Sequence, residues 1–193
     1  FHCAAVEKTL QVFHNRHPGR GIQWDRIFRG KEDRFREGQL RIMTAGILGS
    51  IHSPADVHAL SSQQLRDLCL EIRSTLLNYG RKHGGHIGSN LGVVELTVAL
   101  HRVFGSPRDR FVFDVSHQSY VHKMLTGRAE AYLDESRFGE VTGFTNPLES
   151  EHDSFVLGHT GTSISLACGL AKTRDMQHTA AGASEIGNVI AII

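Results

Sequence analysis

The sequence lacks the features that mark several common classes of protein. Its three cysteines, Cys3, Cys69 and Cys168, are far apart and form no CxxC pair, which argues against a disulfide framework or a zinc site. No apolar run approaches the roughly 20 residues of a membrane span, and the N-terminus lacks the pattern of a signal peptide. A formal net charge of +1 gives no reason to expect nucleic-acid binding. We therefore expect a soluble, cytoplasmic protein with no nucleic-acid or membrane partner.

Several familiar site motifs are also missing. The sequence contains no GxGxxG and no GxxxxGK[ST], and the stretch Gly161 to Ser165 does not match the GxSxG nucleophile motif. His117 and His122 are five residues apart, which on a helix would turn them about 140° away from each other. A metal site built on this histidine pair is therefore not expected, and no metal ligand is assigned.

Residues 1–42 differ from the rest of the chain. They begin with Phe1, are rich in arginine and show little regular hydrophobic periodicity. We predict that they form a leader that is disordered or not native, such as an upstream reading frame joined to a start at Met43; a regulatory basic arm is the alternative. The folded part would then be residues 43–193.

From residue 53 onward the pattern predicts alternating helices and strands. Ser61 and Gln64 have the spacing of a capping box for a helix from Ser62 to Tyr79. Further helices are predicted at 91–104, where Asn90 would be the N-cap, at 118–125 and at 164–174, and strands at 111–115, 154–157 and 188–193. This order predicts an α/β fold with a parallel sheet.

Three loops, 83–90, 114–119 and 158–163, are rich in Gly, His and Ser and follow regular elements. If the strands are neighbours, such loops meet at the carboxyl edge of the sheet. The helix after 158–163 would offer its N-terminal amides to an anion, and imidazoles would move protons. These features favour a phosphorylated ligand or cofactor, although each histidine alone has a structural hydrogen bond as its alternative. The long excursion 142–153 is a further functional candidate.

Three long motifs identify the chain more specifically than its composition does. They are Gly84 to His101 (GGHIGSNLGVVELTVALH), Phe113 to Arg128 (FDVSHQSYVHKMLTGR) and Gly158 to Ser165 (GHTGTSIS). Together they strongly resemble the N-terminal part of the 1-deoxy-D-xylulose-5-phosphate synthase family, thiamine-diphosphate enzymes of the transketolase superfamily. The resemblance covers about residues 47–193.

The resemblance implies condensation of pyruvate with D-glyceraldehyde 3-phosphate, with loss of CO₂, to give 1-deoxy-D-xylulose 5-phosphate, a precursor for isoprenoid and thiamine synthesis. By position in the motifs, His117, Gly158, His159 and Thr160 would contact thiamine diphosphate. His86 would lie beside the reacting thiazolium carbon as the catalytic residue, which agrees with the proton transfers that such chemistry requires.

The same resemblance sets expectations beyond the sequence. The family continues into Gly-Asp-Gly and a later Asn that hold Mg²⁺, and a later domain carries the activating Glu. The chain would therefore be a partial three-layer parallel-sheet thiamine-diphosphate-binding fold, truncated before the metal-binding motif and inactive alone. The full-length parent would be a homodimer.

Some positions depart from the family pattern. Ser116 stands where many members have Gly, Thr160 and Gly161 replace a more usual Ser-Ser, and the excursion 142–153 differs from its commonest form. These departures leave the acceptor specificity open. The alternatives are another transketolase-like thiamine-diphosphate enzyme with a different ketol donor or acceptor, and a stand-alone module without catalytic activity.

Overall fold

The computed structural model describes residues 46–181 and 185–193, all of which belong to one compact unit. The predicted leader, residues 1–42, lies outside the described residues and stays a prediction. In chain order the elements are η1 (Leu48–Ser50), α3 (Pro54–Ala59), α4 (Ser62–Lys82), α5 (Ile87–Gly92), α6 (Val94–Val103), β1 (Arg110–Phe113), α7 (Tyr120–Lys123), η2 (Met124–Arg128), α8 (Glu130–Leu133), η3 (Glu135–Arg137), α9 (Ser163–Ala181) and β2 (Val189–Ile192). Within these ranges, no helix is both long and apolar enough to cross a membrane.

Helix α4 begins where the sequence predicts. The backbone N–H of Gln64 donates to Ser61 Oγ at 3.3 Å, and the N–H of Ser61 donates to Gln64 Oε1 at 3.0 Å, which completes the capping box. The predicted end was wrong, because the helix continues through Gly80 to Lys82. A Cβ at Gly80 would lie 2.5 Å from Ile87 Cγ1. This glycine therefore serves the close approach of α5 and does not end α4.

The second helix was predicted with the wrong boundary. In place of one helix that starts after Asn90, the structure has α5 from Ile87 and α6 from Val94, with a break at Val93 (φ −118°, ψ 13°). Asn90 lies inside α5 and is fully buried. Its side chain makes long-range hydrogen bonds that a sequence-local capping rule does not consider.

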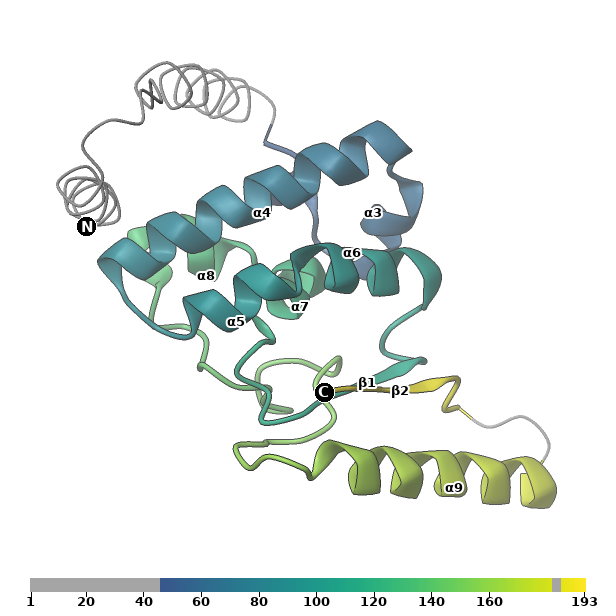
Figure 1. The fold of residues 1–193 in the computed structure, drawn as a ribbon. Helices are drawn as coiled ribbons and strands as arrows, with labels where there is room; N and C mark the ends of the chain where they lie inside the picture. The colour runs from purple at the N-terminus through teal and green to yellow at the C-terminus, as the bar shows by residue number, and fades with distance from the viewer. Residues whose placement is uncertain (1–45, 182–184) are drawn as a thin grey trace, which may run out of the picture. The chain divides into compact units, whose positions relative to one another are not determined.

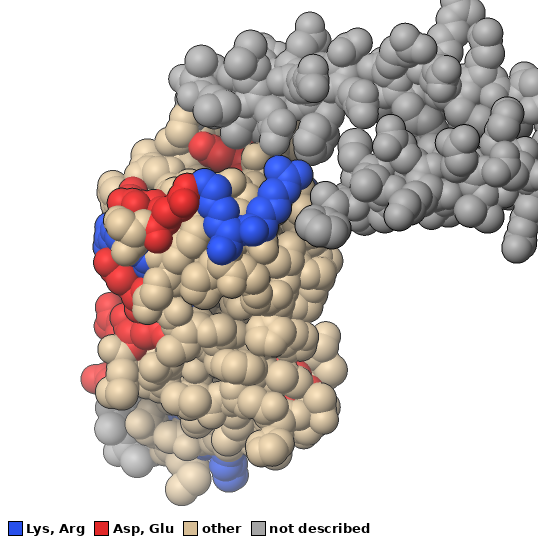
Figure 2. Space-filling view, turned by 90° about the vertical axis from the view of Figure 1, so that its left-hand side faces the viewer, with Lys and Arg blue, Asp and Glu red and all other residues tan. Residues whose placement is uncertain are grey.

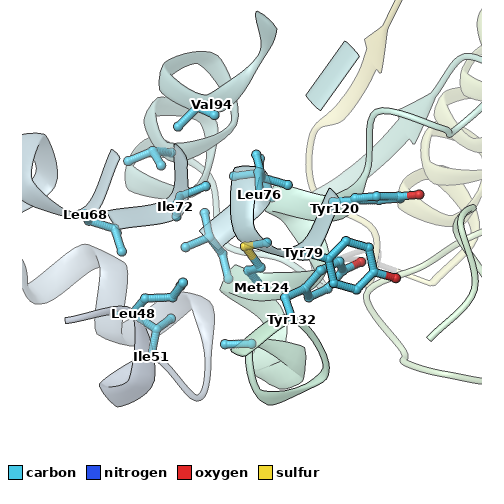
Figure 3. Packing of buried hydrophobic residues seen from close by; sticks show 14 of the residues in the cluster. Leu48, Ile51, Leu68, Ile72, Leu76, Tyr79, Val94, Tyr120, Met124 and Tyr132 are labelled. Carbon is cyan, nitrogen blue, oxygen red and sulfur yellow. The ribbon is translucent and has the colours of Figure 1, made fainter. Parts of the chain in front are cut away.

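The main core lies between α4 and the helices that face it. Leu68, Ile72, Leu76 and Tyr79 recur on one face of α4 and are buried. They pack with side chains from η1, α6, α7, η2 and α8, among them Leu48, Val94, Tyr120, Met124 and Tyr132 (Figure 3). Each fully buried large aliphatic side chain stabilises the fold by about 1.5–3 kcal/mol. At one end of the core the rings of Tyr79, Tyr120 and Tyr132 gather within 5.0–6.0 Å of one another.

The turn after α7 places a glycine in contact with the N-terminal part of the described chain. Gly127 has φ 86°, and a Cβ there would lie 2.7 Å from the carbonyl oxygen of His52. The helical geometry that starts at Tyr120 is interrupted at Thr126 and Gly127, as the sequence predicts.

A parallel pair of strands separates the helices from α9. β1 pairs with β2 in the register Arg110 to Val189 through Phe113 to Ile192. Phe111, Phe113 and Ile192 pack with Leu100 and Phe104 of the α6 end, and α9 lies on the other side of the strands (Figure 1). This order of layers confirms an α/β fold.

The predicted strand 154–157 was wrong. That stretch is in no strand, and its carbonyls accept hydrogen bonds from side chains: Thr145 Oγ1 donates to Phe155 O at 2.7 Å and Ser116 Oγ donates to Leu157 O at 3.0 Å. Apolar alternation alone cannot distinguish such a side-chain-anchored segment from a paired strand.

Candidate functional site

Asp114 follows β1 and occupies the start of α9. Its carboxylate accepts hydrogen bonds from the backbone N–H of Gly161 at 2.9 Å and of Ser163 at 3.1 Å. These bonds hold the pKa of Asp114 below its ordinary value. Two of the amides that were predicted to face an anionic ligand thus bind a side chain of the protein itself, and a ligand at the rest of this turn stays a prediction.

Two residues after β1 adopt a left-handed backbone. Val115 has φ 58° and Ser116 has φ 68°, a conformation that favours glycine. Ser116 is fully buried, and its hydroxyl donates to Leu157 O while it accepts from the N–H of Thr145 at 3.1 Å. This explains the serine at a position where many members of the resembled family have glycine: its hydroxyl joins the β1 loop to two other segments.

Asn90 joins the loop before α5 to the loop after β1. Its Nδ2 donates to the carbonyl of His86 at 2.7 Å and of His117 at 2.8 Å, and its Oδ1 accepts from the N–H of Tyr120 at 2.8 Å. One amide thus fixes three backbone groups. As a result, the loops 83–90 and 114–119 are held side by side.

This arrangement brings two predicted site residues together. The rings of His86 and His117 lie edge to face with centroids 5.3 Å apart. His86 is exposed, and its Nδ1 is 3.4 Å from Tyr120 Oη, which also accepts the backbone N–H of His86 at 3.2 Å. The ring of Phe144 lies 5.5 Å away, and a Cβ at Gly143 would be 3.7 Å from His86 Nδ1.

The third loop is attached to this pair through the end of β1. Gly158, His159 and Thr160 are exposed, and the turn that holds them is closed by Thr162 Oγ1, which donates to His159 O at 2.9 Å. The turn reaches β1 through the bond from Gly161 to Asp114. These three residues have no direct bond to either histidine, so their predicted contact with a cofactor stays a prediction.

Two buried polar atoms near these loops have no hydrogen-bond partner among the residues that the structure describes. They are His117 Nδ1 and Gln118 Oε1. Because buried polar atoms are normally hydrogen-bonded, these atoms fit a ligand that offers both hydrogen-bond donors and acceptors. In the part of the chain that the structure describes, no group of three or more His, Cys, Asp or Glu side chains is arranged to hold a metal ion.

Asp114 is the one Lys, Arg, Asp or Glu residue in the three loops, and its carboxylate accepts from the backbone N–H groups of Gly161 and Ser163. On the side of the molecule where α4 ends and α5 and α9 begin, charged side chains gather toward one end, and a broad surface without charge lies beside them (Figure 2). Apart from Asp114, the groups that these loops offer to a ligand are therefore imidazole, hydroxyl, amide and backbone groups.

Sequence reasoning missed three residues that surround His86, namely Asn90, Tyr120 and Phe144. Asn90 was interpreted as a helix cap, and Tyr120 and Phe144 belong to apolar or mixed stretches that resemble core positions. The polar run just before Tyr120 was the available signal, but only the folded chain shows that its hydroxyl reaches the loop before α5.

Comparisons with known proteins agree with this geometry. A sequence model of the 1-deoxy-D-xylulose-5-phosphate synthase family matches residues 48–193. The chain belongs to the 1-deoxy-D-xylulose-5-phosphate synthase family. A synthase of this name from Acidobacterium capsulatum is 55% identical over 130 residues, which are 67% of this chain and 21% of the relative.

Two further synthases of the family give the same result. The one from Chlamydia trachomatis is 56% identical over 131 residues, which are 67% of this chain and 20% of the relative. The one from Dehalococcoides mccartyi is 48% identical over 147 residues, or 76% of this chain and 22% of the relative. The chain thus spans about a fifth of the length of these synthases.

Proposed function

We propose that residues 48–193 form part of the thiamine-diphosphate pocket of a 1-deoxy-D-xylulose-5-phosphate synthase. The observation that carries this proposal is the pairing of His86 with His117, whose ring centroids are 5.3 Å apart, where two of the three loops meet in a member of that family. The proposed reaction condenses pyruvate with D-glyceraldehyde 3-phosphate and releases CO₂. The described residues would then be one part of a three-layer thiamine-diphosphate-binding fold.

His86 has the geometry of a residue that moves protons at the reacting centre. Its ring is exposed, and the Tyr120 hydroxyl lies 3.4 Å from its Nδ1. A hydroxyl that donates to Nδ1 places the ring proton on Nε2 and aims that N–H away from Tyr120, toward the open side. Imidazole exchanges protons near neutral pH, which decarboxylation and release of a new ketone both require.

His117 and the turn at 158–160 would hold the cofactor. His117 offers an Nδ1 without a protein partner, and Gly158 has open space where a Cβ would stand, so a ligand can approach its backbone. His159 and Thr160 add an exposed imidazole and hydroxyl. When bound, thiamine diphosphate supplies the carbon nucleophile and electron sink for the reaction.

The other properties of the family are part of the same proposal. We expect Mg²⁺ to be bound by residues outside the described ranges, a homodimeric assembly and a cytoplasmic location. Each of these stays a prediction from the family resemblance.

A chimeric enzyme tests the proposed function. The matching stretch of the Acidobacterium capsulatum synthase is replaced by residues 48–193, and formation of 1-deoxy-D-xylulose 5-phosphate from pyruvate and D-glyceraldehyde 3-phosphate is measured. We expect an active chimera that needs thiamine diphosphate, and His86→Ala should lower its kcat at least about 100-fold. The matched control is His83→Ala, which changes an exposed histidine on the same loop whose ring lies tilted against that of Tyr79, with centroids 4.7 Å apart; this variant should keep the activity.

The alternatives give different results in this assay. A folded chimera that releases no CO₂ from pyruvate but turns over another ketol donor would favour a different transketolase-like activity. A folded chimera with no cofactor dependence at all would favour a module without catalysis. The 193-residue chain, assayed alone beside the chimera, is expected to form no product.

A further inference from the structure

A chain of ionisable side chains lies buried beside the site, and none of its members touches the proposed cofactor pocket. It runs through His101, His122, Asp153, Arg128, Glu149 and Lys123. We call these six residues the buried charge network. The Lys123 and Asp153 side chains have no exposed surface, and those of Arg128 and Glu149 are 10% and 11% exposed.

Most polar atoms of the network are hydrogen-bonded, and Arg128 Nε and His101 Nδ1 are the network atoms without a partner among the described residues. Arg128 donates from Nη1 and Nη2 to the two carboxylate oxygens of Asp153 at 2.8 and 2.9 Å, and from Nη1 to Glu149 at 3.2 Å. Lys123 Nζ donates to Glu149 Oε2 at 2.6 Å and to the carbonyl of Thr142 at 2.8 Å. Burial would raise the pKa of Glu149, but hydrogen bonds from Lys123 and Thr142 outweigh it and hold that pKa below its ordinary value.

The two histidines join the network as neutral rings. Burial lowers the pKa of both His101 and His122, and Asp153 opposes the effect at His122 only in part. With the Nε2–H of His122 donated to Asp153 at 3.1 Å, its Nδ1 accepts from His101 Nε2 at 2.9 Å. This leaves His101 Nδ1 as a bare lone pair, which agrees with its lack of a partner.

All the charged contacts connect the same two parts of the chain. His122, Lys123 and Arg128 belong to α7 and η2, whereas the groups that accept their hydrogen bonds belong to the excursion 142–153. Thr142 is held at three atoms, because its carbonyl accepts from Lys123 and its N–H and hydroxyl donate to Glu149. Apolar contacts could bury the same surface, but they would not fix the backbone of the excursion at one position.

The segment held in this way forms one wall of the His86 site. Gly143 and Phe144 directly follow Thr142, and they approach the His86 ring. The other wall is Tyr120, which lies three residues before Lys123 in the same helix. Lys123 therefore joins the two elements that touch His86, one through its own helix and one through Thr142.

We propose that Lys123 and Glu149 are positioning residues that set the spacing between Tyr120 and the segment 142–145, and so fix the ring of His86. The consequence for catalysis rests on the proposed function, but the positioning itself does not. If the pair is broken, the fold can persist on its aliphatic core while the wall at 143–144 loosens.

The test uses the chain itself and needs no turnover. Hydrogen exchange of the Thr142 and Thr145 amides and the ring signals of His86 are measured by NMR in Glu149→Gln and Lys123→Met, with His86 assigned through His86→Gln. Because a hydrogen bond to a charged group is worth about 1.5–3 kcal/mol, we expect exchange at these amides to become about tenfold faster or more. We also expect the His86 signals to shift.

The control is Leu68→Ala, which opens a cavity in the core of α4, among side chains that the network does not include. It should lower stability throughout the chain and leave the His86 signals unchanged. If Lys123→Met does not fold, the test rests on Glu149→Gln, which should fold because glutamine still offers an acceptor to the Thr142 amide. Unchanged His86 signals with exchange rates that match those of the control would overturn the proposal. An inactive chimera would bear only on the proposed function.

Discussion

The buried charge network and the open face around His86 differ in where they place charge. The network buries four charged side chains that pair with one another and leave Arg128 Nε without a partner among the described residues. The loops that approach His86 and His117 instead offer imidazole, hydroxyl and amide groups at an accessible surface. Fixed charges in a protein interior are costly unless they are paired, and paired charges define one geometry. The two regions therefore differ in kind: paired charges hold the segment 142–153 to α7 and η2, whereas imidazole, hydroxyl and amide groups face one another around His86.

The largest loss of stability is expected where the network is densest. Asp153→Ala removes the carboxylate that accepts from Arg128, His122 and the N–H of Asn146. Because removal of one partner leaves a buried cation uncompensated, the free energy of unfolding should fall by about 3–5 kcal/mol. Urea unfolding followed by circular dichroism measures this loss. A loss below about 1 kcal/mol would show that the network contributes no more than an exposed ion pair.

A loss of comparable size is expected at the amide that joins the loops of His86 and His117. Asn90→Leu leaves the carbonyls of His86 and His117 and the N–H of Tyr120 without their partner. Each buried unsatisfied group costs about 1–3 kcal/mol, although water can reach the exposed His86 side. The same urea titration measures this loss. Asn90→Asp keeps the shape of the side chain but places a carboxylate against two carbonyl oxygens, so it should be at least as destabilising as Asn90→Leu. If both variants unfold at the wild-type midpoint, Asn90 does not hold the loops.

Acid should lower the stability of the fold through its buried histidines. Burial lowers the pKa of His152 to about 4, and it also lowers the pKa values of His101 and His122. An unfolded histidine titrates near about 6.5, so between about pH 6.5 and 4 the unfolded chain binds more protons than the folded one. Stability should therefore be constant above about pH 7 and fall as the pH drops through this window.

Thermal unfolding at a series of pH values checks this expectation. His152→Gln, which can still bond to Ser106 Oγ, should flatten the curve. A melting temperature that rises on acidification would contradict the neutral state of these rings.

The smallest effect is expected for an ion pair at the surface. Arg73 and Glu95 form two hydrogen bonds between α4 and α6, but their side chains are 35% and 60% exposed. Water and salt screen such a pair, so Glu95→Gln should cost at most about 1 kcal/mol, and less at high salt. A loss as large as that of Asp153→Ala would remove the distinction between buried and exposed charges in this molecule.

The sequence predicts much of the fold because the relevant signals are local. The capping box at Ser61, the apolar periodicity of α4 and the aromatic run of β1 depend on neighbours within a few residues, and the structure confirms all three. The end of α4 and the true role of Asn90 were missed, because a glycine that admits Ile87 and an amide that spans two loops depend on partners far along the chain.

The site shows the same division. The polar residues of the loops at His86 and His117 predict a site there; the structure brings these two rings together, and their role stays a prediction. The occupation of the α9 N-terminus by Asp114 was not predictable, because a carboxylate at a strand end has no local signal for the helix it will meet. The buried charge network was missed for the same reason. Glu149 and Asp153 belong to the polar excursion 142–153, whose sequence resembles that of a solvent-exposed loop.

The glycine at the turn after α7 also limits which sequences this fold can accept. Gly127 has φ 86°, a backbone conformation that other amino acids rarely adopt. A Cβ at this position would also lie 2.7 Å from the carbonyl oxygen of His52, so any other residue would clash there. In a library with all twenty residues at each position, selected for folding, position 127 should keep glycine alone. The exposed Glu130, three residues later, should accept most substitutions. The number of residues tolerated would therefore rise from almost none at position 127 to nearly all at position 130.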